Sequence, residues 1–487
     1  MFMLGIDIGT TGCKSMLFEI GGRIVSQNYI EYELITTGEF IEQDAEQWWS
    51  LVTRTVRNTV AASRIASDRI SAVGVSSQGI SFVPVDINGH VLGNAISWLD
   101  TRAFAQAAEL RGRFSAESLF AVTGKRISPV YTLPKIMWIR ENKPETYCAT
   151  YKFLMGLDYI TYRMTGRFVT DYSMASGTMM FNIMKREWDE NILGMCGIDT
   201  DKLPEVMCAG SVVGPVTEEA ALEMGITSGT CVALGAQDQK CAAIAAGIAD
   251  GVATVSLGTA TAVSSLMTKP VPDSSMLIPS FALDQKNWIL ESVISTAGAC
   301  LKWLRNTVFS DMGYSEMCGL AESAAPGANG LYFYPYLAGA STPFWREDIE
   351  GSFYGIKLTT TRAEIVRSLL EGIAYQIRAN IEIHERLNTK IIEIRLYGGG
   401  AENDLWCQLI ADITGKTVNV LYTPETANLG AAMLAGKACG AYKNPVDLVQ
   451  KSLLVLKTIN PCVERQSVYR DTYEKYMKIN QSIMKEG

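Results

Sequence analysis

The feature that most constrains the fold is an apolar strand that ends in a glycine–threonine turn, because it occurs once in each half of the chain. Phe2–Ile8 runs into Gly9-Thr10-Thr11-Gly12, and Val252–Leu257 ends in Gly258-Thr259, as if one unit had been used twice. A third strand enters Gly398-Gly399-Gly400. Glycines let backbone N–H groups approach phosphate oxygens without an intervening Cβ, and threonine hydroxyls add donors. Together the turns predict a nucleotide gripped between two domains.

Composition limits the class of protein and its partners. The chain has 487 residues, of which 48% are hydrophobic and 19% charged, so we expect a globular protein with room for large cores. The formal net charge of −8 disfavours nucleic acid as a partner. The longest apolar stretch, Cys241–Ala249, is far shorter than the ~20 residues that span a bilayer. The first residues lack the basic segment of a signal peptide, so we predict a cytoplasmic protein without membrane contact.

Several chemistries are disfavoured by the reactive residues. None of the 11 cysteines forms a CxxC pair, which argues against zinc fingers and iron–sulfur clusters. The 2 histidines disfavour a Ser-His-Asp hydrolase. We therefore expect carboxylates to serve as the general acid or base. Gly415-Lys416-Thr417 imitates a Walker A motif, but position 410 is isoleucine where the first glycine should stand.

Local patterns predict an α/β chain. Gly21-Gly22 separates two strands of a hairpin, and Asp44 is a helix N-cap. Thr361 and Glu364 form a capping box. We place a domain boundary between residues 246 and 247, giving domains 1–246 and 247–487. The further predicted elements are strands at Arg69–Val75, Val91–Trp98 and Cys231–Leu234, and small-residue helices at Cys241–Ala249 and Thr426–Gly436.

Two carboxylates stand out by position. Asp7 lies inside an apolar strand, where it is either a buried acid bonded to a loop or a contact to a Mg²⁺–nucleotide complex. Asp238 follows the end of a strand, where it is either a helix N-cap or a general base. The residue pattern alone leaves both alternatives open.

With these motifs, the chain resembles the FGGY carbohydrate kinases, of the actin/hexokinase/Hsp70 ATPase superfamily. The resemblance covers roughly residues 3–440. The matching motifs are Asp7-x-Gly9-Thr10-Thr11-x-x-Lys14, Trp98-x-Asp100-x-Arg102, Gly235-Ala236-Gln237-Asp238, Ser256-Leu257-Gly258-Thr259, Gly399-Gly400-Ala401 and the signature from Gly351 to Gly372.

The resemblance implies a two-domain actin-like (ribonuclease H-like) α/β fold with an interdomain cleft, and ATP- and Mg²⁺-dependent phosphorylation of a sugar or polyol. It implies Asp238 as the catalytic base and Asp7 as the metal contact. The implied ATP contacts are Thr10, Thr11, Lys14, Gly258, Thr259, Gly298, Lys302, Gly400, Ala401 and Asn403. The implied sugar contacts are Gln78, Gly79, Trp98, Asp100, Asp238 and Gln239. A shortened loop after Gly400 leaves open whether Asn403 or Asp404 faces the adenosine.

The identity of the sugar substrate follows less directly from the sequence than the kinase family does. Gly79 and Ile80 follow Gln78 where glycerol kinases carry Arg-Glu and xylulokinases usually carry Met-His, so glycerol is disfavoured. The pattern is most similar to the xylulokinase and gluconokinase branch. We expect a ketopentose such as D-xylulose, with gluconate, a tetritol or another ketose as alternatives, and we expect Gly79 to enlarge the sugar side. A non-catalytic actin-like nucleotide-binding protein is the rival outside this class, and a homodimer is left open. Because the sugar contacts all lie in the first half, we also expect sugar to bind before the halves close.

Overall fold

The structure, a computed structural model, describes residues 1–269, 275–387, 390–422, 425–443 and 455–485. The chain divides into two compact units. Unit 1 comprises Met1–Ala245, Thr268–Ile289 and Glu425–Gln450, and unit 2 comprises Ala246–Met267, Leu290–Pro424 and Lys451–Gly487. Among the described residues, no helix is both long and apolar enough to cross a membrane.

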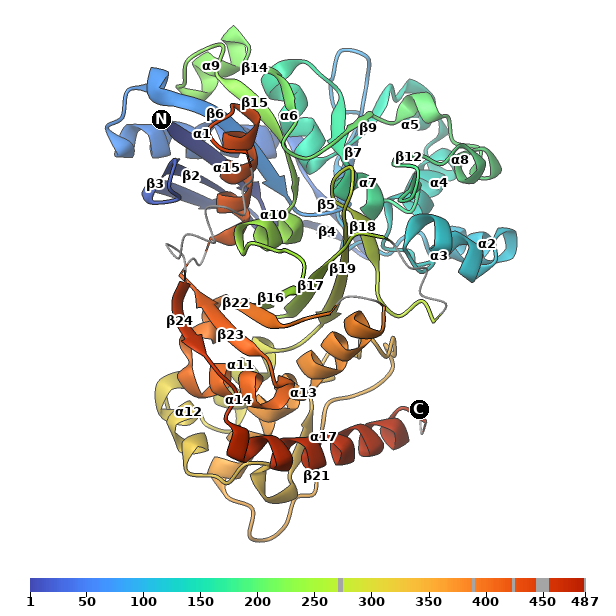
Figure 1. Cartoon of the computed structure of the whole chain (residues 1–487). Helices are drawn as coiled ribbons and strands as arrows, with labels where there is room; N and C mark the ends of the chain where they lie inside the picture. The colour runs from blue at the N-terminus through green and yellow to red at the C-terminus, as the bar shows by residue number, and fades with distance from the viewer. Residues whose placement is uncertain (270–274, 388–389, 423–424, 444–454, 486–487) are drawn as a thin grey trace. The chain divides into compact units, whose positions relative to one another are not determined.

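A mixed sheet forms the centre of unit 1, with the strand order β14-β15-β6-β1-β2-β3 (Figure 1). Its parallel strands are β1 (Phe2–Ile8), β6 (Ile70–Ser77) and β15 (Cys231–Gln237). The hairpin predicted around Gly21-Gly22 is confirmed, since β2 (Gly12–Glu19) pairs antiparallel with β3 (Ile24–Glu31). Ser77 lies opposite both Ile8 and Gln237, so the carboxyl ends of the parallel strands meet at one edge.

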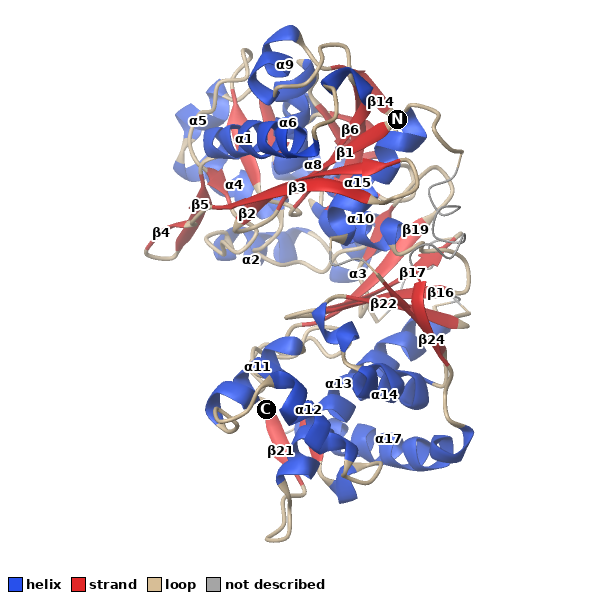
Figure 2. Cartoon of the chain, turned by 90° about the vertical axis from the view of Figure 1, so that its left-hand side faces the viewer, coloured by secondary structure: helices blue, strands red, loops and turns tan. Residues whose placement is uncertain are grey.

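Helices cover both faces of this sheet (Figure 2). Helix α1 (Ala45–Ser63) begins after the predicted N-cap Asp44, whose carboxylate accepts from the N–H groups of Glu46 and Gln47. Its residues Trp48, Val52 and Val56 are fully buried in the core of unit 1. Hydrophobic burial of this kind is the main stabilising term for such a layer.

Helix α15 (Thr426–Ala438) packs on β1 and β6 of unit 1, although it comes late in the sequence. Two glycines allow the close approach. A Cβ at Gly5 would lie 2.1 Å from the carbonyl oxygen of Asn428, and one at Gly74 would lie 2.1 Å from that of Ala431. The segment Glu425–Gln450, placed after the predicted boundary at 246/247, therefore groups with the first unit.

Two predicted elements in unit 1 differ from the structure. The strand predicted at Val91–Trp98 is only β8 (Ala95–Ile96), because the chain bends at residues 92–93 before it and turns at residues 98–99 after it. The helix predicted from Cys241 is α10 (Asp238–Ala245), which begins at Asp238 itself. The first helical turn therefore follows β15 without an intervening loop.

The other elements of unit 1 surround this sheet. Strands β4 (Ile35–Thr37), β5 (Phe40–Gln43), β7 (Phe82–Val85) and β9 (Lys152–Met155) form a second sheet with β8. The helices are α2 (Phe104–Arg113), α3 (Ala116–Thr123), α4 (Thr132–Asn142), α5 (Pro144–Ala149), α6 (Gly156–Thr165), α7 (Tyr172–Gly177), α8 (Glu190–Cys196) and α9 (Glu218–Met224). The remaining strands outside the central sheet are β10 (Val169–Asp171), β11 (Phe181–Asn182), β12 (Glu187–Trp188), β13 (Glu205–Met207) and β18 (Ser280–Ala282). Strand β14 (Val212–Pro215) is the edge strand of the central sheet and pairs antiparallel with β15.

Unit 2 is built on a sheet whose strands run in the order β19-β17-β16-β22-β23-β24. These are β16 (Val252–Leu257), β17 (Thr261–Met267), β19 (Trp288–Ile294), β22 (Glu393–Tyr397), β23 (Thr417–Leu421) and β24 (Val455–Ile459). Strands β20 (Tyr332–Tyr334) and β21 (Ser352–Tyr354) pair separately. The helices are α11 (Gly298–Thr307), α12 (Tyr314–Glu322), α13 (Arg362–Arg386), α14 (Asp404–Thr414) and α17 (Val463–Ile483). The capping box of Thr361 and Glu364 is confirmed at the start of α13.

Candidate active site

The carboxyl edge of the sheet in unit 1 gathers several of the predicted site residues. The N–H of Gln78 donates to the carbonyl oxygen of Ile8 over 2.8 Å, which joins the end of β6 to the turn that follows β1. Gln237, at the end of β15, lies in register with Ser77. The glycine–threonine turn, Gln78 and the start of α10 with Asp238 therefore lie along one edge.

Asp7 lies in the centre of this edge, in register with Lys14 on β2 and Ser76 on β6. Burial raises the pKa of its carboxyl group. A hydrogen bond donated by the Ser76 hydroxyl over 2.8 Å opposes that shift, the charge of Glu425 adds to it and Lys14 opposes it. Lys14 itself donates to the Glu425 carboxylate over 2.5 Å. The ionised form of Asp7 would therefore be favoured by a further cation.

A chain of amide hydrogen bonds links Gln78, a predicted sugar contact, to the Gly9–Gly12 turn, a predicted phosphate contact. The amide nitrogen of Gln78 donates to Oε1 of Gln43 over 2.8 Å, and Nε2 of Gln43 donates to the Thr10 carbonyl oxygen over 2.9 Å. Nε1 of Trp98 donates to the hydroxyl oxygen of Thr10 over 2.9 Å. Sequence reasoning missed Gln43, because no motif marks a glutamine that precedes a helix cap.

Asp238 and Gln239 begin helix α10. The N–H of Gln239 donates to Oδ1 of Asp238 over 2.6 Å, so the carboxylate is turned back on the first turn of its own helix. A carboxylate at a helix N-terminus is stabilised by the unpaired N–H groups there. The two interpretations of Asp238, as a helix-capping acid and as a catalytic base, are therefore compatible, because the helix binds only its Oδ1 through this hydrogen bond.

Asp100 is fully buried and bound by protein donors on both oxygens. Burial acts to raise its pKa, but hydrogen bonds from Arg102 and from the N–H of Ile41 hold the pKa below its usual range. Arg102 also binds Glu42 over 2.9 Å. In the structure Asp100 fixes the strand–turn geometry beside Trp98, and its predicted contact with sugar stays a prediction.

In unit 2, three segments that contain glycine pack against one another. They are the turn at Gly258, the start of α11 at Gly298 and the turn at Gly400. The N–H of Gly298 donates to the carbonyl oxygen of Gly258 over 2.9 Å, and that of Ala297 donates to the carbonyl oxygen of Thr259 over 2.9 Å. A Cβ at Gly298 would lie 2.6 Å from the Gly258 oxygen. A Cβ at Gly400 would lie 2.5 Å from Cγ of Leu257, directly before the first of these turns. The predicted contact of Gly258, Gly298 and Gly400 with the nucleotide stays a prediction.

The other predicted nucleotide contacts have distinct surroundings. Lys302 is exposed on α11, whereas Ala401 is buried. Asn403 is the N-cap of α14, since its Oδ1 accepts from the N–H of Trp406 over 2.8 Å. Asp404 forms an ion pair with Lys457. The choice between Asn403 and Asp404 at the adenosine stays a prediction.

The chemical types of the groups present suit ATP and Mg²⁺: backbone N–H groups for phosphate and a carboxylate for the metal ion. The side-chain-free backbone around Gly258, Gly298 and Gly400 suits phosphate or nucleotide contact. Within the described part of the chain, no three His, Cys, Asp or Glu side chains form a metal-binding group. A magnesium ion that keeps waters and phosphate oxygens needs only one or two carboxylates, which Asp7 can supply.

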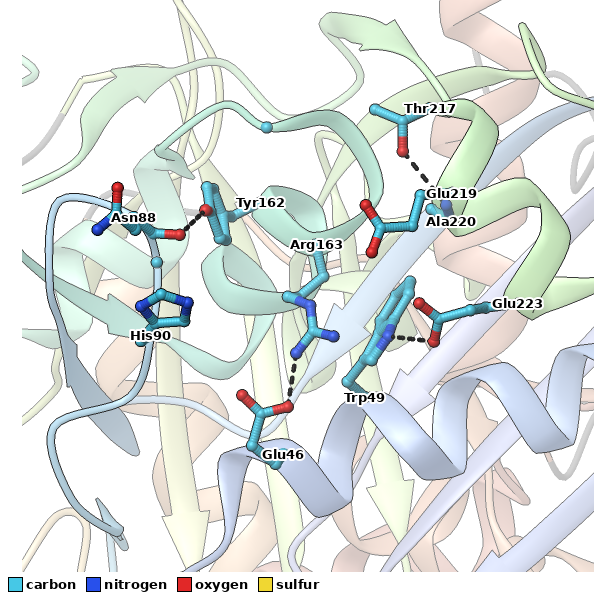
Figure 3. A pocket seen from close by; sticks show the side chains of 12 residues that line it. Glu46, Trp49, Asn88, His90, Tyr162, Arg163, Thr217, Glu219, Ala220 and Glu223 are labelled. Carbon is cyan, nitrogen blue, oxygen red and sulfur yellow. Dashed lines mark hydrogen bonds and ion pairs between the residues drawn. The ribbon is translucent and has the colours of Figure 1, made fainter.

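A separate surface pocket of about 460 Å³ lies between α1, α6, α9 and the 88–90 turn (Figure 3). Its polar groups are bonded to one another. Arg163 pairs with Glu46 over 2.7 Å, and Nε1 of Trp49 donates to Glu223 over 2.8 Å. The pocket is lined by none of the residues predicted for nucleotide or sugar. It is therefore distinct from the edge described above.

Comparison with known proteins assigns the family. Residues 2–245 match the N-terminal domain of the FGGY family of carbohydrate kinases, and residues 253–439 match its C-terminal domain. The chain belongs to the FGGY family of carbohydrate kinases. The resemblance predicted from the motifs is thus confirmed, and the protein is a carbohydrate kinase.

Among similar FGGY kinases, the xylulose kinase of Bacillus subtilis (strain 168) is 30% identical over 481 residues, covering 98% of this chain and 96% of that protein. The gluconokinase of the same organism is 30% identical over 452 residues, covering 90% and 88%. The structure of gluconate kinase from Lactobacillus acidophilus aligns with a TM-score of 0.93 at 26% identity, covering 99% of this chain and 98% of that one. That of a ligand-bound xylulose kinase from the same organism aligns at 0.92 with the same identity and coverage. The predicted α/β, two-domain actin-like fold is confirmed.

Proposed function

We propose that this kinase transfers the γ-phosphoryl group of ATP, with Mg²⁺, to a hydroxyl group of a ketopentose such as D-xylulose. The observation that carries the proposal is the shared edge of unit 1. There the turn with Thr10, the amide of Gln78 and the carboxylate of Asp238 follow three neighbouring parallel strands. A phosphate turn, a polyol-binding amide and an acid are the parts that hydroxyl phosphorylation needs.

Each group has a proposed role. Asp238 accepts the proton of the attacking hydroxyl, and Gln78, Gly79, Trp98, Asp100 and Gln239 surround the sugar. Asp7 takes part in holding Mg²⁺, which neutralises charge on the phosphates of ATP. The remaining nucleotide contacts are proposed to be Thr10, Thr11, Lys14, Gly258, Thr259, Gly298, Lys302, Gly400, Ala401 and Asn403. Because phosphoryl transfer has a loose transition state, positioning and charge neutralisation dominate its catalysis.

Charge favours a neutral sugar over gluconate. The proposed sugar contacts are neutral or acidic, and two nearby cations already have partners. Arg102 binds Asp100 and Glu42, and Lys135 donates to the carbonyl oxygen of Ser97 over 2.8 Å. A carboxylate on the substrate would meet the like charge of Asp238 without a matching arginine at these positions. The relatives named gluconokinase nevertheless make gluconate the necessary comparison.

The substrate is tested by sugar-dependent ADP release. We expect kcat/KM to be at least about tenfold higher for one ketopentose than for gluconate, erythritol or glycerol, because a site built for one set of hydroxyls leaves groups unpaired with another. The panel should hold both enantiomers of xylulose and ribulose. A higher kcat/KM on gluconate would contradict the ketopentose assignment, and ADP release independent of every sugar would contradict kinase activity on these substrates.

A magnesium titration tests Asp7. We expect Asp7→Asn to raise the Mg²⁺ concentration for half-maximal rate by about tenfold, because a negative ligand or outer-sphere partner is lost while the Ser76 hydrogen bond has an acceptor left. Glu31→Gln, on the exposed end of β3, is the control and should leave the titration unchanged. If Asp7→Asn folds normally and titrates as the wild type does, Asp7 is a structural acid.

A further inference from the structure

The side chain of Gln237 occupies the space beside Gly79. A Cβ at Gly79 would lie 2.0 Å from Nε2 of Gln237 and 2.7 Å from its Cδ. The φ angle of Gly79 lies outside the left-handed region, so the backbone there does not require glycine. A side chain at position 79 would instead have to displace the Gln237 amide. This packing corrects the expectation that Gly79 enlarges the sugar side, because the space is already filled.

Gln237 carries an amide oxygen that lacks a partner. Its Oε1 is buried and accepts no hydrogen bond among the described residues, and the same is true of Oε1 of Gln78 at the neighbouring strand end. The N–H of Gln237 is held by the Ser173 hydroxyl over 3.0 Å, which fixes the start of the side chain. Buried acceptors without donors are rare in native proteins and call for an explanation. The hydroxyl groups of a sugar are donors of the required kind.

The backbone next to Gly79 is strained. Ile80 has a φ of 58°, which is costly for a β-branched residue. The N–H of Ser81 donates to the Gly79 carbonyl oxygen over 2.8 Å, closing a tight turn around Ile80. The Ser81 hydroxyl in turn accepts from the N–H of Trp98 over 2.9 Å. Strain of this type concentrates at ligand-binding positions, and here the strained turn lies between Gly79, which is next to the Gln237 amide, and Ser81, which binds the Trp98 backbone.

We propose that Gln237 is a specificity-determining residue of this kinase. Its Oε1 accepts a hydrogen bond from one hydroxyl group of the sugar, and its amide, packed on Gly79, sets the shape of the site next to Asp238. The inference rests on the proposed function and deepens it. Gly79 and Gln237 act as a matched pair, in which the small residue at one position makes room for the amide at the other.

The hydrogen bond is tested with Gln237→Met, which keeps the length of the side chain and removes the amide. We expect KM for the preferred sugar to rise about tenfold while kcat changes less than about threefold, because the contact serves binding in both ground and transition states. Deoxy analogues identify the hydroxyl. On the analogue that lacks the bonded group, Gln237→Met and the wild type should have equal kcat/KM. Gln27→Met, on the exposed strand β3, is the matched control and should behave as the wild type.

The packing is tested with a double-mutant cycle at the two positions. Gly79→Ala should lower kcat/KM at least about tenfold by displacing the amide, whereas the same substitution made in Gln237→Gly, where no amide is left to displace, should lower kcat/KM less than about threefold. Thermal unfolding of each variant separates misfolding from a change of specificity. Unchanged KM and sugar ranking in Gln237→Met, or equal losses from Gly79→Ala with and without the Gln237 side chain, would overturn the inference. These results leave the proposed function standing, since its own failure is a wild type that phosphorylates no ketopentose.

Discussion

Asp238→Asn is expected to lower kcat by about 100-fold or more while leaving the affinity for ATP nearly unchanged. General-base catalysis is worth typically ~10²–10⁴ in rate, and an amide cannot accept the proton of the attacking hydroxyl. The substitution keeps the Oδ1 acceptor for the N–H of Gln239, so helix α10 should still begin at the same residue. The loss should therefore appear in kcat rather than in folding.

The measurement is steady-state ADP release with saturating sugar and ATP, together with nucleotide binding by calorimetry. Asp250→Asn, an exposed acid before β16, is the matched control and should retain wild-type kcat. Retention of more than a tenth of kcat by Asp238→Asn would remove the general-base assignment. A parallel loss of ATP affinity would instead indicate that Asp238 shapes the nucleotide or metal site.

Gly298→Ala is expected to raise KM for ATP at least about tenfold. A Cβ at this position would lie 2.6 Å from the carbonyl oxygen of Gly258, which is closer than real Cβ contacts. The atom that it would meet belongs to the backbone and cannot rotate away as a side chain could. The turn at Gly258-Thr259 must then shift, and the hydrogen bond from the Gly298 N–H must lengthen. Because phosphate-binding backbone works only when its N–H groups keep their directions, we expect the effect on ATP to exceed that on sugar.

The matched control is Gly319→Ala in helix α12 of the same unit, where a Cβ would meet nothing within 4 Å. That variant should keep the wild-type KM for ATP and be more stable by up to about 1 kcal/mol, since alanine is the better helix former. Thermal unfolding of both variants is measured beside the kinetics. If Gly298→Ala folds and binds ATP as the wild type does, the convergence of the glycine segments serves packing alone.

Local sequence patterns determined much of the secondary structure. Strands β1 and β16 have the predicted bounds, and Asp44 and Thr361 cap their helices as predicted. The reason is that apolar runs, capping side chains and glycine turns act over a few neighbouring residues. The same local signals placed Asp238 at the end of a strand, and the motifs assembled from them identified the family before any contact was known.

Tertiary structure decided which residues meet. The sequence predicts α15 as a helix of small residues, but it does not predict where this helix packs. The structure shows that Gly5 and Gly74, on strands far away in the sequence, let α15 approach the sheet of unit 1. Gln43 follows no motif, yet it joins Gln78 to the Thr10 turn. A glycine at position 79 suggests free space, but the side chain of Gln237 from another strand fills that space. Such contacts depend on the register of strands far apart in the chain, which no local pattern encodes.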